Sequence, residues 1–170
     1  MSDIFTTLTG GTTMRTETIE RKIYTWKELS EDIKEKAIEK LYDINVDHDW
    51  WDFIYEDAAN IGLKITEFDI GRGSYCHAEL TEGIEDVRKA ILKHHGPTCD
   101  TYKLAEQYEG KLLDEEGDEN EDEVADFLNS LLEEYRCILQ KECEYLTSEE
   151  AIIGTIEANE YEFDENGDIA

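Results

Sequence analysis

The chain contains 170 residues, and its 44 acidic residues against 16 Lys and Arg give a formal net charge of −28 at pH 7. This length is enough for one folded domain, and a hydrophobic content of 39% is sufficient for a buried core. The charge disfavours direct binding to nucleic acid or to an anionic membrane surface, because both carry charge of the same sign. We therefore expect a basic protein surface as the partner.

The N-terminal residues differ in composition from the rest of the chain. Residues 1–17 are rich in Thr and Gly, which predicts a flexible arm, and residues 18–170 are expected to form a single acidic domain. The arm has no basic segment followed by an apolar run, and no stretch approaches the roughly 20 apolar residues of a membrane span. A cytoplasmic location is expected, in which the four cysteines are free thiols.

The first elements expected in chain order are a strand and a helix. Residues 18–25 alternate weakly between polar and apolar side chains and predict a short strand. Apolar residues then recur at helical spacing over residues 26–44, where Ser30 precedes two acidic residues and is a typical helix start.

The central stretch predicts a helix followed by a hairpin. Asp47 is expected to cap a helix that places Trp50 and Phe53 on an apolar face and ends at about Gly62. The following residues are rich in β-branched and aromatic side chains and predict an antiparallel hairpin with strands at residues 63–70 and 75–80.

The second half of the chain is predicted to be mainly helical. Residues 114–123 contain eight carboxylates and no base, which predicts a solvated loop or a helix start. Helices are expected at residues 81–95, 99–113, 124–146 and 148–156, followed by a small hairpin at Asn166–Gly167. Together these elements predict an α+β fold, in which a small antiparallel sheet of about three strands packs with five or six helices.

Acidic residues are concentrated toward the C-terminus, where residues 111–170 carry 21 acidic residues against three basic ones. Carboxylates three or four positions apart on a helix are about 5 to 6 Å apart, a spacing close to that of successive phosphates in a nucleic acid strand. Two rows with this spacing are the candidate partner-binding residues, and a generic solvated face is the alternative interpretation of either row. The first row contains Asp49, Asp52 and Glu56, and the second contains Asp122, Asp126 and Glu133 together with Glu119 and Glu123.

Metal binding and catalysis are alternatives that would use Cys76, His77, His95 and Cys99. The spacing of these residues matches no structural zinc pair, and no nucleophile motif is present. The acidic loops lack the pattern of a calcium-binding loop, and the turn at Gly71–Ser74 lacks the lysine of a phosphate-binding loop. We therefore expect no metal, no cofactor and no enzymatic activity.

Three stretches of the sequence resemble small acidic proteins carried by bacteriophages and prophages: YTWKELSEDIKEKAIEKLYDIN, DHDWWDFIYEDAANIGLKITEFDIGRGSYCHAEL and LTSEEAIIGTIEANEYEFDENGDIA. The resemblance covers most of residues 22–100 and about 145–170. By analogy with other small acidic phage proteins, it implies an anti-CRISPR or antirestriction inhibitor. Such a protein would occupy the basic groove of a defence nuclease in the bacterial host cell, as a nucleic-acid mimic. Relatives described as antitoxin-like imply the alternative of an antitoxin that neutralises a basic toxin by direct binding.

Overall fold

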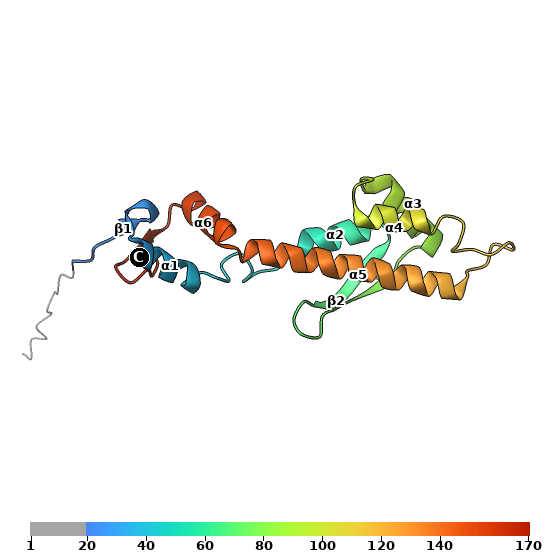
Figure 1. Ribbon diagram of the computed structural model, residues 1–170, viewed down its shortest axis with the longest axis horizontal. Coiled ribbons are helices and arrows are strands. Elements are labelled where there is room, and N and C mark those ends of the chain that lie inside the picture. The colour runs from blue at the N-terminus through green and yellow to red at the C-terminus, as the bar shows by residue number, and fades with distance from the viewer. Residues whose placement is uncertain (1–19) are drawn as a thin grey trace, which may run out of the picture.

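The computed structural model describes residues 20–170 and has an elongated shape with a lobe at each end of its long axis (Figure 1). The arm predicted at residues 1–17 lies outside the described residues. None of the described helices is both long enough and apolar enough to cross a membrane. In chain order the elements are β1 (Tyr24–Thr25), the 3-10 helix η1 (Trp26–Glu28), α1 (Glu31–Lys40), α2 (Asp52–Asn60), β2 (Leu63–Asp69), β3 (Tyr75–Leu80), α3 (Ile84–His94), α4 (Asp100–Gln107), α5 (Glu121–Leu146), α6 (Glu149–Ala158) and β4 (Glu162–Phe163).

The predicted α+β fold class is confirmed, but the strands form two separate antiparallel pairs among the described residues. The predicted hairpin is present, because β2 pairs with β3. The strand predicted at residues 18–25 is shorter than expected, and β1 pairs with β4 near the C-terminus instead of joining the hairpin. Trp26 and Phe163 pack with their ring centroids 5.9 Å apart, and this contact holds the two ends of the described chain together.

Buried hydrophobic side chains form two clusters, one in each lobe. The small lobe comprises β1, η1, α1, α6 and β4, and the large lobe comprises α2 to α5 with the hairpin. The core of the small lobe is formed by Trp26, Leu29, Ala37, Ile152, Ile156 and Phe163. The core of the large lobe includes Trp50, Phe127 and Tyr135. A single domain over residues 18–170 stays a prediction, within which the structure shows two hydrophobic cores.

The long helix α5 extends through the large lobe and leads into α6 of the small lobe (Figure 1). The two helices are separated at Thr147 and Ser148, where the Ser148 hydroxyl accepts a hydrogen bond from the backbone N–H of Ala151. Ser148 therefore caps α6 as predicted. Ser30 is likewise the N-cap residue of α1, but the predicted helix over residues 26–44 is divided, because Leu29 and Ser30 adopt extended backbone conformations.

The central helix α2 begins at Asp52, so the prediction that Asp47 caps it was wrong. Trp50 precedes the helix and is buried, with its ring in edge contact with Trp51 and with Phe68 at centroid distances of 5.5 and 5.9 Å. The prediction that Phe53 is buried was also wrong, because its side chain is 54% exposed. The core-facing stripe of α2 is formed by Ile54 and Ala58 instead.

The same five-residue turn, with the sequence Asp-Glu-x-Gly-Asp, occurs in both lobes. In Asp114–Asp118 and in Asp164–Asp168, the first carboxylate accepts backbone hydrogen bonds of 2.8 to 3.1 Å from the residues two and four positions later. Gly117 and Gly167 occupy the fourth position with φ of +88° and +82°, in the left-handed region that glycine adopts without steric cost. One local sequence therefore forms the same turn in two different tertiary environments.

We expect Gly117→Ala and Gly167→Ala to destabilise the protein by different amounts. Each substitution forces an L-residue into the left-handed region, which costs about 1 to 2 kcal/mol. A Cβ atom at Gly167 would also lie 3.1 Å from the Ile33 carbonyl oxygen and 3.2 Å from the Ala37 nitrogen of α1, whereas no described atom lies within 4 Å at Gly117. Thermal unfolding should show the larger loss for Gly167→Ala, and equal losses would contradict the packing of this turn on α1.

Candidate partner-binding surface

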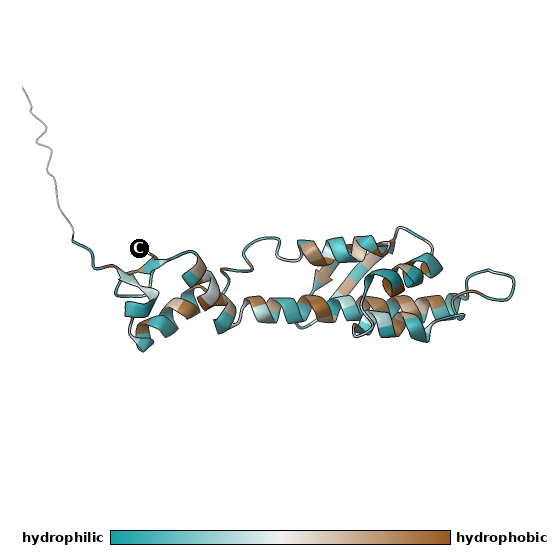
Figure 2. Ribbon diagram, turned by 90° about the horizontal axis from the view of Figure 1, so that it is seen from above, coloured by the Kyte–Doolittle hydropathy of each residue, from teal (hydrophilic) through white to brown (hydrophobic). Residues whose placement is uncertain are grey.

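The candidate surface lies at the end of the large lobe, where the loop after α4 meets the first turns of α5 (Figure 1). Residues 114–126, which we call the acidic tip, contain nine carboxylates and no Lys or Arg. Eight of these acidic residues are exposed, and Glu123 is partly buried. None of the nine forms an ion pair within residues 20–170. The loop is correspondingly hydrophilic in Figure 2.

Local hydrogen bonds determine the shape of the acidic tip. The turn at Asp114–Asp118 brings Leu113 and Glu119 together in an isolated antiparallel bridge. Behind the turn, the buried Leu112 anchors the chain, and its carbonyl accepts a hydrogen bond of 3.0 Å from the N–H of Asn120. Asn120 is also the N-cap residue of α5, whose first turn carries three acidic residues that interact favourably with the helix dipole. These hydrogen bonds therefore hold the backbone that carries the carboxylates of the tip.

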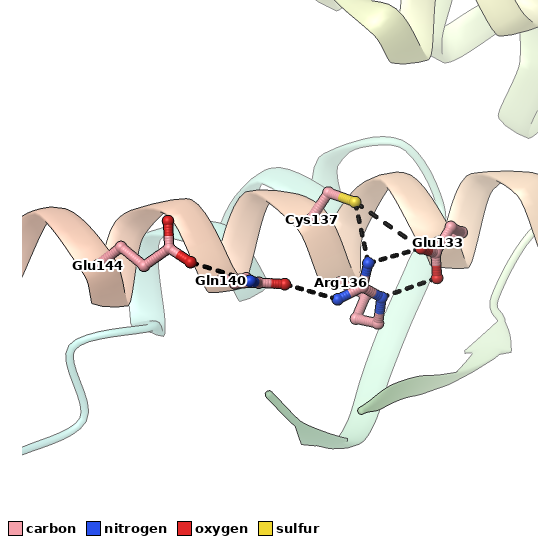
Figure 3. A network of polar contacts seen from close by, with 5 residues as sticks. All are labelled: Glu133, Arg136, Cys137, Gln140 and Glu144. Carbon is pink, nitrogen blue, oxygen red and sulfur yellow. Dashed lines mark hydrogen bonds and ion pairs between the residues drawn. The ribbon is translucent and has the colours of Figure 1, made fainter. Parts of the chain in front are cut away.

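Of the five predicted partner-binding residues in the second row, the structure places four on this tip and one outside it. Glu119, Asp122, Glu123 and Asp126 belong to the tip. Glu133 lies further along α5 and accepts two hydrogen bonds from the guanidinium group of Arg136, at 2.8 and 2.6 Å (Figure 3). Arg136 lowers the pKa of Glu133 and neutralises its charge locally. The row of unpaired carboxylates on this helix face therefore ends at Asp126.

The pairing of Glu133 is part of a chain of side-chain contacts along α5. Arg136 donates a further hydrogen bond of 2.8 Å to Gln140, and Gln140 donates one of 2.9 Å to Glu144 (Figure 3). The spacings of three and four residues are those at which helical side chains meet. Arg136 follows Glu133 by three positions, so the sequence permits this pair, and the structure shows that it forms.

The other predicted row, Asp49, Asp52 and Glu56, is exposed but does not adjoin the acidic tip. Asp49 precedes α2, so only Asp52 and Glu56 lie on the helix. In both views α2 lies beside the middle of α5, whereas the tip lies at the N-terminal end of α5 (Figures 1 and 2). The two rows are therefore separate surface features.

The residues considered for metal binding or catalysis fall into two pairs. Cys76 is buried in the core on one face of β3, where burial raises the pKa of its thiol to about 11, and His77 is exposed on the other face. His95 and Cys99 line a cavity of about 370 Å³ with Cys137 and Lys141. Within residues 20–170, no three His, Cys, Asp or Glu side chains are placed so that they could hold a metal ion.

A partly buried polar network beside this cavity was not predicted from the sequence. His95 Nδ1 lies 2.7 Å from Thr101 Oγ1, and His95 Nε2 lies 3.5 Å from Asp57 Oδ1, a distance longer than that of a good hydrogen bond. The Tyr135 hydroxyl donates a 2.8 Å hydrogen bond to Asp57 Oδ2. These residues come from α2, the end of α3, α4 and α5. Because the Thr101 hydroxyl belongs to a residue that is only 3% exposed, we interpret the network as a structural link between helices.

We expect Asp57 to contribute a pH-dependent part of the stability. The imidazole of His95, and then the Tyr135 hydroxyl, lower the pKa of Asp57 against the opposing effect of burial. A carboxylate with a lowered folded-state pKa stabilises the protein above its unfolded pKa of about 3.9, and this stability is lost as the pH falls through the folded pKa. The contribution should be about 1 kcal/mol, since half of the side chain is exposed.

The measurement is urea unfolding of the parent and of Asp57→Asn at about pH 7 and about pH 3. The parent should be the more stable protein at the higher pH, and the difference should shrink at the lower pH. Comparing the two proteins at each pH cancels the change in charge repulsion that all other carboxylates produce. If the difference in free energy of unfolding between the two proteins were the same at both pH values, protonation of Asp57 would not contribute to the pH dependence of stability.

Comparison of the chain with protein-family models, with curated proteins and with solved structures found no match. The resemblance to small acidic phage proteins therefore stays a prediction from the sequence.

Proposed function

We propose that this protein is an inhibitor that binds a basic nucleic-acid-binding protein by inserting the acidic tip into the groove that normally holds nucleic acid. The observation that supports this proposal is the set of nine carboxylates at the tip, none of them paired within residues 20–170. A groove lined by Lys and Arg attracts such a surface at long range and pairs with it at contact. The inhibition requires no catalysis.

The extent of the tip limits what it can imitate. On α5, Asp122 and Asp126 are one helical turn apart, and the unpaired row ends there because Arg136 neutralises Glu133. The tip therefore replaces a few successive phosphates and not a long strand. The acidic tip would therefore compete best in a groove that binds its nucleic acid through a short run of phosphate contacts.

The proposed target class is a nuclease of a bacterial defence system, of the CRISPR or restriction type. This part of the proposal rests on the resemblance of the sequence to small acidic phage proteins. The antitoxin alternative invokes the same attraction to a basic surface, but it does not require that the partner bind nucleic acid at that surface. The two functions therefore differ in whether nucleic acid and this protein compete.

Competition is the test of the proposed function. Purified RNA-guided effectors and restriction enzymes are mixed with labelled target DNA, and binding and cleavage are followed as this protein is added. Inhibition should be overcome by excess DNA, and it should weaken between about 0.05 M and about 0.3 M salt, because screening acts on the attraction that drives binding. A stable complex that contains the nuclease, the DNA and this protein together would exclude groove occupation and would favour an antitoxin-like or allosteric contact.

A further inference from the structure

The outer face of the β2–β3 hairpin carries an exposed pair of stacked rings. A β-bulge between Ile65 and Glu67 changes the register, so that Glu67 pairs with His77 across the two strands. Tyr75 and His77 lie two positions apart on β3, and their rings stack with centroids 4.6 Å apart and planes 27° from parallel. Cys76, between them, points into the core. The ring pair therefore faces away from the hydrophobic core.

Carboxylates surround this ring pair. The Tyr75 hydroxyl donates a 2.8 Å hydrogen bond to Glu67 Oε1, and His77 Nδ1 lies 3.9 Å from Glu67 Oε2. The side chains of His77 and Glu67 are each 64% exposed. Glu79 is the next residue of β3 on the same face, and it forms no ion pair within residues 20–170 although Lys64 is its cross-strand neighbour. One face of the His77 ring thus stacks on Tyr75, and the His77 side chain is largely exposed beside Glu67, with Glu79 next on the same strand face.

We propose that this hairpin face binds an arginine side chain of a basic protein partner. The guanidinium group would stack on the face of the His77 ring away from Tyr75 and donate hydrogen bonds to Glu67 and Glu79. Side chains two positions apart on a strand are about 6.6 Å apart. A guanidinium group stacked on His77 would therefore bring the N–H donors at its edge within reach of the carboxylate of Glu79.

Arginine is the side chain whose chemistry matches this face. Its guanidinium group is planar, stacks on rings and offers a fork of N–H donors to carboxylates, whereas the lysine ammonium group is a compact charge without a face to stack. A nucleic acid base could also stack on the rings, but its phosphates would then approach Glu67 and Glu79. Charge complementarity therefore selects a basic protein segment as the occupant.

The hairpin face and the acidic tip are separate surfaces, so this inference does not depend on the proposed function. The probes are two short glycine-rich peptides with the same number of charges, one with arginines and one with lysines. Affinities for the full chain are measured by calorimetry, and the contact is located by NMR chemical-shift changes. The arginine peptide should bind about fivefold more tightly, with its largest shifts at Glu67, Tyr75 and His77. Equal affinities, or shifts confined to the acidic tip, would overturn the proposal.

Two substitutions distinguish binding through the ring stack from general electrostatic attraction of a basic peptide to an acidic protein. His77→Ala should abolish the preference for arginine while leaving the affinity for the lysine peptide nearly unchanged. His48→Ala is the matched control, because the side chain of His48 is similarly exposed, at 65%, and lies beside a carboxylate, Asp47. It should keep the full preference. A preference that persisted in His77→Ala would also overturn the proposal, and the shift map of the parent decides the question should that variant fail to fold.

Discussion

Neutralising three carboxylates of the acidic tip should weaken binding to the proposed nuclease target by about 100-fold at low salt. The variant combines Asp122→Asn, Glu123→Gln and Asp126→Asn, which preserve the size of each side chain and remove its charge. All three residues lie in the first two turns of α5, next to the Asp114–Asp118 turn. In the proposed complex they would contribute both to long-range attraction and to direct pairing with basic groups, so their loss should slow association and speed dissociation.

The control for this prediction changes the same amount of charge in the other lobe. Glu149, Glu150 and Glu157 of α6 are exposed and lie outside the acidic tip, and the three Glu→Gln changes leave the tip intact. This variant should lose only the small part of the affinity that comes from long-range attraction to the net charge, and this part should disappear at high salt. Glu133→Gln should also have a small effect, because Glu133 is already paired with Arg136. Equal losses in the tip and α6 variants would mean that net charge alone accounts for binding.

Trp50→Ala should destabilise the protein by about 3 to 5 kcal/mol, because it removes a large aromatic side chain from a packed core. Trp50 is only 9% exposed, and its ring contacts those of Trp51 and Phe68. The neighbouring substitution Phe53→Ala is the matched comparison, since Phe53 is 54% exposed and should contribute about 0.5 kcal/mol or less. Urea unfolding of both variants is the measurement. Similar losses in the two variants would contradict the orientation of α2.

Local sequence signals, which involve only a few neighbouring residues, were sufficient to predict several helix starts, the β2–β3 hairpin and the exposed acidic segment. Ser30 and Ser148 mark the starts of α1 and α6, because an N-cap is decided by the residue and the turn that follows it. The β2–β3 hairpin follows from two runs of β-forming residues around a short turn. The solvated acidic segment before α5 follows from its lack of apolar and basic residues. The net charge, and with it the expectation of a basic partner, is likewise a property of composition.

The remaining features depend on contacts between distant residues or on the direction of single side chains. β1 pairs with β4 because Trp26 meets Phe163 in the core of the small lobe, and no local pattern distinguishes that partner from the hairpin. Phe53 lies on the exposed side of α2 because Ile54 and Ala58 are the residues that face the core, and this orientation is decided by packing. The network of Asp57, His95, Thr101 and Tyr135 requires four elements to converge. The extent of the acidic row depends on the direction of the Arg136 side chain toward Glu133, which the spacing of three residues permits but does not by itself select.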